Sequence, residues 1–257
     1  MTSSSNSDYA VLVAVFIVAA VLHGISGTGY SLITIGGLSA YYSLADSVVL
    51  VLIPTAILNL TAWLVGGGTF WHNFTFYIKE YWLLIVLSFL GSVLGAYLLL
   101  WVNQHYLLLL LSAILVWYVG SAVFGKQIRL PNTKKSLAVM GVAGGIAGGA
   151  TNAMSPILMM YLLSISDDKN TLIKVSNACF FMGKVAQAIV LFPAFVAMQS
   201  ETWTLLGMAT ALSLVFVFVG LWLGRFLPKQ YFRTLILVIL TVLAIKLGYG
   251  SIMTLWG

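Results

Sequence analysis

GGIAGGATNAMSP, from Gly144 to Pro156, is the stretch that decides how this chain folds. It lies inside an otherwise apolar run from Leu137 to Leu163. Its four glycines and its small polar side chains are poor for a continuous helix. Irregular backbone is tolerated at membrane depth only where it is buried in protein or lines a cavity. The stretch therefore predicts a broken helix inside a membrane protein.

The same pattern occurs once before, as GISGTGYS from Gly24 to Ser31. A shift of 121 positions places Gly24 on Gly145 and Ser31 on Asn152. We interpret the two stretches as paired broken helices that meet at a site near the middle of the membrane.

The composition excludes a soluble domain. Of 257 residues, 61% are hydrophobic and only 7% are charged, which is typical of a multi-pass membrane protein. The net charge of +6 comes from basic residues in short loops, so no nucleic-acid partner is expected. A single cysteine, Cys179, excludes an intrachain disulfide and a thiolate cluster, and no metal or cofactor is expected. Met1 to Asp8 has no basic residue before the apolar run, which argues against a cleaved signal peptide.

The apolar pattern divides the chain into two similar halves within one all-α bundle. Ala10 to Tyr42 would be about 48 Å long as one helix, more than a bilayer needs, and its glycines divide it. Asp46 and Asp167 or Asp168 are expected helix N-caps, and Gly66 to Glu80 is an expected aromatic-rich loop. The predicted first repeat (1–125) has a broken block at 10–42 and spans at about 46–64, 82–101 and 106–124. A basic linker covers 126–136. The second repeat (137–257) has a broken block at 137–165 and spans at about 168–192, 203–224 and 232–252.

Loop charge decides between two topologies. If each broken block crosses the membrane, the loop cations divide five against five; if each block is a re-entrant hairpin, all ten lie on one face. The positive-inside rule favours the second arrangement, with inverted repeats, both termini outside and the basic loops in the cytoplasm. Inverted repeats with discontinuous helices are typical of secondary transporters. The ten cations are Lys79, Lys126, Arg129, Lys134, Lys135, Lys169, Lys174, Arg225, Lys229 and Arg233.

Lys184 is the one cation near the middle of a predicted span. A lysine there costs about 2.5–3.5 kcal/mol on insertion scales, so it is expected to face the bundle interior. The alternative is a lysine that extends to the interface or is deprotonated by burial, and its charge stays open. It shares a helical face with Asn177, Phe181 and Gln187. Lys246 lies nearer the end of its span and is expected to extend to the interface. No carboxylate lies in mid-span, so the substrate is expected to supply the negative charge.

The second half-helix of each broken block begins at mid-membrane and offers its free N–H groups to an anion. These starts are expected at Thr28–Ser31 and Thr151–Ala153. The alternative is that the small residues only let helices cross closely, as is expected for Gly91/Gly95 and Gly220/Gly224. The predicted substrate-binding residues are Gly27, Thr28, Gly29, Tyr30, Ser31, Asn59, Gly148, Gly149, Ala150, Thr151, Asn152, Asn177, Lys184 and Gln187.

The doubled glycine block and the four-segment half resemble the sulfite exporter TauE/SafE family, also called the 4-toluene sulfonate uptake permeases. The resemblance covers the chain from about Val11 to Gly250. It implies a multi-pass transporter in a bacterial inner membrane that carries sulfite or sulfonates such as sulfoacetate or taurine derivatives. The partners it implies are the lipid bilayer and a small anion. The direction of transport, the coupling ion and the oligomeric state stay open.

Two other functions, an intramembrane protease and a metal-cation transporter, have less support in the sequence. Gly24 to Gly27 matches the Gly-x-Ser-Gly of intramembrane serine proteases, but such an enzyme needs a histidine on a later span. His23 is adjacent to that serine, and His72 and His105 lie in predicted loops, so no catalytic residue is expected. A metal-cation transporter needs a cluster of ligands, and the spans offer Cys179 and His23 alone. A membrane protein without transport activity remains a further alternative.

Overall fold

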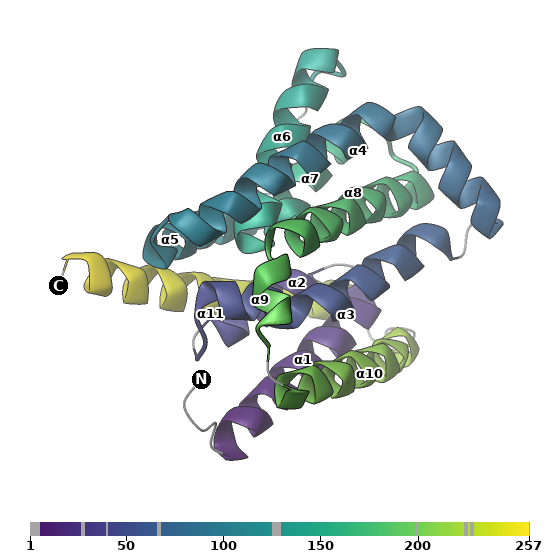
Figure 1. The fold of residues 1–257 in the computed structure, drawn as a ribbon. Helices are drawn as coiled ribbons and strands as arrows, with labels where there is room; N and C mark the ends of the chain where they lie inside the picture. Colours follow the sequence, from purple (N-terminus) through teal and green to yellow (C-terminus); the bar gives the residue numbers. More distant parts are fainter. Residues whose placement is uncertain are drawn as a thin grey trace.

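The described part of the chain folds into helices alone, as expected. The computed structural model describes residues 6–26, 29–39, 41–65, 68–124, 130–198, 200–223, 226 and 229–256. Figure 1 shows the helices crossing one another in a bundle. Within the described residues there are eleven: α1 Asn6–Ser26, α2 Tyr30–Leu38, α3 Leu44–Leu64, α4 Phe70–Trp101, α5 Gln104–Phe124, α6 Lys134–Thr151, α7 Met154–Ile165, α8 Lys169–Val190, α9 Phe192–Val196, α10 Ser200–Leu223 and α11 Lys229–Trp256.

Five described helices are long and apolar enough to cross a membrane: α3, α4, α5, Leu206–Leu223 of α10 and Leu237–Trp256 of α11. The chain is therefore a multi-pass membrane protein. α8 has 22 residues but is more polar, because it carries Lys174, Asn177, Lys184 and Gln187. All four are buried, and the helix packs against α3, α4, α6 and α7. Its polar side chains thus face protein instead of lipid.

Both glycine-rich blocks are interrupted, as predicted. The first is divided between α1 and α2, and the second between α6 and α7. The second break lies at Asn152, whose φ of 60° is left-handed, and at Ala153. The glycines from Gly144 to Gly149 are themselves helical. The expectation that they would open the helix was therefore wrong, and the chain reverses just after them.

Each block folds back on itself. A Cβ placed on Gly144 of α6 would lie 3.6 Å from Cγ2 of Ile157 in α7. In a straight helix these residues would be about 20 Å apart. A Cβ on Gly37 of α2 would likewise lie 3.0 Å from Val15 of α1. The two blocks are helical hairpins and not long kinked helices.

The glycines of α6 let it cross α4 with the two backbones in contact. A Cβ on Gly145 would overlap the carbonyl oxygen of Ser88, and a Cβ on Gly149 would overlap that of Ser92. From the other side, a Cβ on Gly91 would overlap the carbonyl oxygen of Val142. Glycine is required here because only a missing side chain permits this approach.

The same kind of crossing joins α1 to α10. A Cβ on Gly24 would overlap the carbonyl oxygen of Val217, and a Cβ on Gly220 would overlap that of Val21. The close packing expected for Gly91, Gly95 and Gly220 is confirmed, whereas Gly224 lies outside the described residues.

α3 and α8 run antiparallel through the middle of the bundle. The Lys174 ammonium near the start of α8 donates to the carbonyl oxygens of Ala62 and Val65 at the end of α3, at 3.1 and 2.5 Å. Further along α8, the Phe181 ring lies 6.2 Å from that of Trp63. Lys174 is buried, although its position near the end of a span suggested a loop cation. It caps α3, where carbonyls lack helical partners.

The segment from Gly66 to Glu80, expected as a loop, is instead largely helical. α4 begins at Phe70 after the N-cap Thr69, and it bends at Tyr81, where φ is −116° and ψ is 19°. The aromatic residues in the first turns of α4 pack on one another at helical spacing, for example Trp71 on Phe74 with ring centroids 6.3 Å apart. Aromatic packing at helical spacing therefore favours helix over loop.

Helix capping differs from the expectation at one of two sites. Asp168 is the N-cap of α8, as predicted, and the side chain and backbone N–H of Thr171 lower the pKa of its carboxyl by donating to it. Asp46 is not the cap of α3. Ser43 is the cap, since its hydroxyl accepts from the Asp46 N–H and donates to the Asp46 carboxylate. The two residues form a reciprocal capping pair, which sequence alone assigned one turn late.

Candidate functional site

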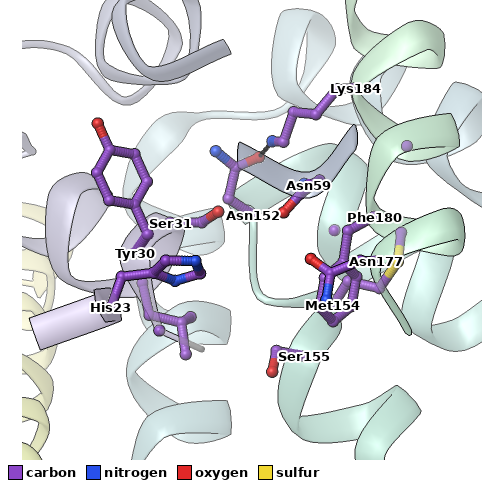
Figure 2. Close-up of a pocket in the computed structure, with 14 residues that line it drawn as sticks. His23, Tyr30, Ser31, Asn59, Asn152, Met154, Ser155, Asn177, Phe180 and Lys184 are labelled. Atoms are coloured by element: carbon purple, nitrogen blue, oxygen red, sulfur yellow. Dashed lines mark hydrogen bonds between the residues drawn. The ribbon is translucent and has the colours of Figure 1, made fainter. Parts of the chain in front are cut away.

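A cavity lies where α2 and α7 begin, beside the middle of α8 (Figure 2). The centre of a water-sized sphere can move through about 40 Å³ of it. One water needs about 10–15 Å³ by this measure, so the cavity has room for a few waters or one small anion. Its lining residues come from six helices and the turns that join them: His23, Gly29, Tyr30, Ser31, Leu32, Asn59, Gly148, Asn152, Met154, Ser155, Asn177, Phe180, Gly183 and Lys184.

Two helix starts meet at this cavity. α2 begins at Tyr30 after Gly29, whose φ of 92° favours glycine, and α7 begins at Met154 after Ala153. Neither preceding residue caps its helix with a side-chain hydrogen bond. The first-turn N–H groups lack intrahelical acceptors and form the positive end of each helix dipole. The start of α2 falls within the expected range Thr28–Ser31, whereas α7 begins one residue after the expected range Thr151–Ala153.

Lys184 extends into the cavity from α8 (Figure 2). It is 5% exposed, and its ammonium donates to Oδ1 of Asn152 at 2.5 Å and to Oε1 of Gln187 at 2.7 Å. Both acceptors are neutral amides, and no carboxylate belongs to the described residues that line the cavity. A protonated Lys184 therefore has no carboxylate counter-ion among the described lining residues.

Gln187 links Lys184 and Asn152 to the end of α6. Its Nε2 donates to the carbonyl oxygens of Gly148 and Gly149 at 3.2 and 2.9 Å, and to Oδ1 of Asn152 at 2.8 Å. Those carbonyls belong to the last turn of α6, and that of Gly148 also accepts from the Asn152 N–H at 2.9 Å. Gln187 does not line the cavity, so it is a positioning residue for Lys184 and Asn152.

Asn152 offers a free donor beside the lysine. Its side chain is 5% exposed, and its Nδ2 group is buried without a hydrogen-bond partner. A buried amide N–H without a partner costs free energy, about 1–3 kcal/mol. An acceptor atom of a bound molecule would remove this cost.

The cavity brings together most of the predicted binding residues. Those that line it are Gly29, Tyr30, Ser31, Asn59, Gly148, Asn152, Asn177 and Lys184. Tyr30 contributes its ring, because its hydroxyl is paired with that of Ser213 at 2.7 Å. Asn177 donates its Nδ2 to the Ile173 carbonyl at 2.8 Å.

Other predicted residues have different surroundings. Gly149 faces α4, Ala150 lies in the apolar core, and the Thr151 hydroxyl donates to the Ala147 carbonyl at 2.9 Å. Gly27 and Thr28 lie outside the described residues.

Six further residues line the cavity that were not predicted from the sequence: His23, Leu32, Met154, Ser155, Phe180 and Gly183. Phe180 and Gly183 lie three and six residues after Asn177. The face of α8 that lines the cavity is therefore rotated by about one residue from the predicted face. Phe181, which belonged to the predicted face, packs on Trp63 instead. Ser155 lies in the first turn of α7, and the late position of that start hid it. His23 precedes the first glycine block by one residue, a signal that was available.

Metal binding has no support in the described part of the chain. No group of three or more His, Cys, Asp or Glu side chains lies close enough to hold an ion. Cys179 is buried in the apolar cluster around Leu158 and Val175.

The comparisons with known proteins give one match. The family model for the sulfite exporter TauE/SafE matches residues 12–247. Neither a curated protein nor a solved structure matches the chain. This match covers nearly the whole chain. The protein is therefore a membrane transporter and not an enzyme, and it belongs to the sulfite exporter TauE/SafE family.

Proposed function

We propose that the protein is a secondary transporter of small sulfur-containing anions, such as sulfite or sulfonates, that works by alternating access. One observation carries the proposal: a buried lysine without a counter-ion shares a cavity with two uncapped helix starts. Three sources of positive potential converge there, and the described lining residues include no carboxylate to neutralise them.

The magnitudes fit a carrier. Each helix start contributes about 0.3–1 kcal/mol to anion binding, and up to about 2 kcal/mol when partly buried. A charged hydrogen bond from Lys184 contributes about 1.5–3 kcal/mol. The Asn152 amide, Ser31 and Ser155 offer further donors to the oxygens of an oxyanion. The sum is enough to hold a desolvated anion and small enough to release it.

Packing between helices supports two inverted repeats. α6 crosses α4 through glycines as α1 crosses α10, and the 121-residue shift relates Gly24 of α1 to Gly145 of α6. α4 also packs extensively on α8, more than its counterpart α3 packs on α10. The other two large contacts, α3 with α8 and α5 with α11, join corresponding helices of the two halves. A two-fold axis between the halves generates this pattern. Because α3 and α8 are antiparallel, the axis is expected to lie in the membrane plane, and rocking of one half against the other would open the cavity alternately.

We further propose that the protein resides in a bacterial inner membrane, with both termini outside and the basic loops in the cytoplasm. This topology predicts opposite accessibility for two exposed residues, Asn103 between α4 and α5 and Lys134 at the start of α6. In intact cells an impermeant maleimide should label Asn103→Cys, and it should label Lys134→Cys only after permeabilisation. The native Cys179 is buried and provides the background. The reverse pattern would overturn the proposed orientation and place the basic linker outside.

Binding of sulfur anions is tested by a thermal-shift panel on the purified protein. Sulfite, sulfate, thiosulfate, sulfoacetate, isethionate and taurine are compared at equal ionic strength against chloride. A ligand at a hundredfold excess over its Kd stabilises the folded form by about 2.7 kcal/mol, so at least one anion should raise the Tm by several degrees. Taurine should have the weakest effect, because its ammonium group would approach Lys184. A panel without any shift beyond chloride would contradict the proposal.

A further inference from the structure

His23 brings a second nitrogen base to the cavity. It lies in α1, is 9% exposed and lines the cavity. Its ring meets the ring of Tyr30 edge-on, with centroids 6.0 Å apart. Figure 2 shows the imidazole of His23 directed toward the cavity from one wall and Lys184 extending from another.

The two bases come from different halves of the chain and from non-equivalent positions. The 121-residue shift relates His23 to Gly144 and Lys184 to Trp63, and neither counterpart lines the cavity. An anion between His23 and Lys184 is therefore placed between a basic group of one half and a basic group of the other.

Few other described titratable groups surround His23. α2 presents Tyr30, and α8 presents Lys184 across the cavity. α10 presents the backbone of Val217 and Leu221 beside the next residue, Gly24. The described lysine of α11, Lys246, lies over the ring of Tyr41, 5.4 Å from its centroid. The described lining residues from α3, α6 and α7 carry no titratable group.

An imidazole responds strongly to a bound anion. Histidine in water changes charge near pH 6.5, so it is mostly neutral at a pH slightly above 7. An opposite charge within about 4–6 Å favours the protonated form by a factor of about 10 to 1,000. By reciprocity, the protonated imidazole strengthens anion binding by the same factor.

We propose that His23 takes up one proton when an anion enters the cavity, so that the carrier moves the anion together with H⁺. This rests on the anion transport proposed above. Water on the open side supplies the proton to an imidazole nitrogen, and the proton returns to water on the other side when the anion leaves. No electron or other group is transferred, and no second coupling ion is required.

The test measures protons and anions in the same sample. Purified protein in weakly buffered detergent solution at about pH 7.5 is titrated with methanesulfonate, which stays ionised, and a pH-indicator dye reports proton uptake. The wild type should take up as much as one proton for each anion bound, and its affinity should rise up to about tenfold for each unit by which the pH falls. His23→Gln should reduce the uptake at least tenfold and flatten the pH dependence. His72→Gln, on the exposed first turn of α4, should behave as the wild type.

A parallel titration with sulfite compares the proton uptake of the wild type with that of His23→Gln. Protonation of sulfite itself contributes equally to both, so the difference in uptake reports on His23. Should His23→Gln fail to fold, His23→Asn replaces it, because wild-type uptake alone would not separate His23 from Lys184, which lines the same cavity. Anion binding without proton uptake overturns the role of His23 and leaves anion transport standing. Full uptake in His23→Gln overturns it as well. If the wild type binds neither anion, both proposals fail.

Discussion

Replacing Lys184 with glutamine is expected to weaken anion binding by at least about 30-fold. Removing one partner of a buried, hydrogen-bonded charge pair costs about 2–5 kcal/mol, and each 1.4 kcal/mol is a factor of ten. Lys184 is the charged end of the network formed with Asn152 and Gln187, whereas both helix starts supply partial charges only. Calorimetric or thermal-shift titration of the strongest ligand of the panel measures the loss.

The same substitution should leave the empty protein folded. The Asn152 oxygen that accepts from Lys184 also accepts from Gln187 at 2.8 Å, so it keeps a partner. A buried charge without a counter-ion also disfavours folding, so the Tm without ligand should hold or rise. Lys246→Gln is the matched control, because Lys246 lies over the Tyr41 ring and does not line the cavity. Equal affinity of Lys184→Gln and Lys246→Gln for every anion would remove Lys184 from the site.

Gly145→Ala is expected to be, with Gly149→Ala, among the most destabilising methyl additions in α6. Its Cβ would overlap the Ser88 carbonyl oxygen and would lie 2.9 Å from Cα of Gly91, both backbone atoms of α4. Neither can move without shifting the helix, so the cost should reach about 3 kcal/mol or more, at the upper end for overpacked cores. Thermal unfolding in detergent should show a fall in Tm and less monodisperse protein.

The adjacent residue provides the control for this experiment. A Cβ on Gly144 would meet only side chains, the nearest at 3.6 Å, which is ordinary contact. Alanine is also favoured over glycine within a helix by about 0.5–1 kcal/mol. Gly144→Ala should therefore be neutral or stabilising. Similar losses at Gly144 and Gly145 would show that flexibility, and not close helix crossing, explains the glycines of this block.

The contrast between these neighbours shows why the sequence was only partly informative about the glycines. Small residues in an apolar run indicated either open backbone or close helix crossing. Gly145 and Gly149 serve the crossing, whereas the chain reverses at Asn152, which has a side chain and a positive φ. Which glycine faces a neighbouring helix depends on the position of α4, more than 40 residues earlier in the chain.

The sequence by itself determined that the protein lies in a membrane, that two glycine blocks are broken, and that Lys184 faces the interior. Hydropathy, repetition and the cost of a charge in lipid are local properties of the chain, and they required no knowledge of its partners. Only the tertiary structure decided that His23, Ser155 and Phe180 line the cavity and that Gln187 accepts a hydrogen bond from Lys184 without lining the cavity itself. Whether a side chain lines a cavity depends on the rotation of its helix about the helix axis and on the residue at which that helix begins. A shift of one or two residues in either, too small for apolar periodicity to detect, changes which side chains an anion meets.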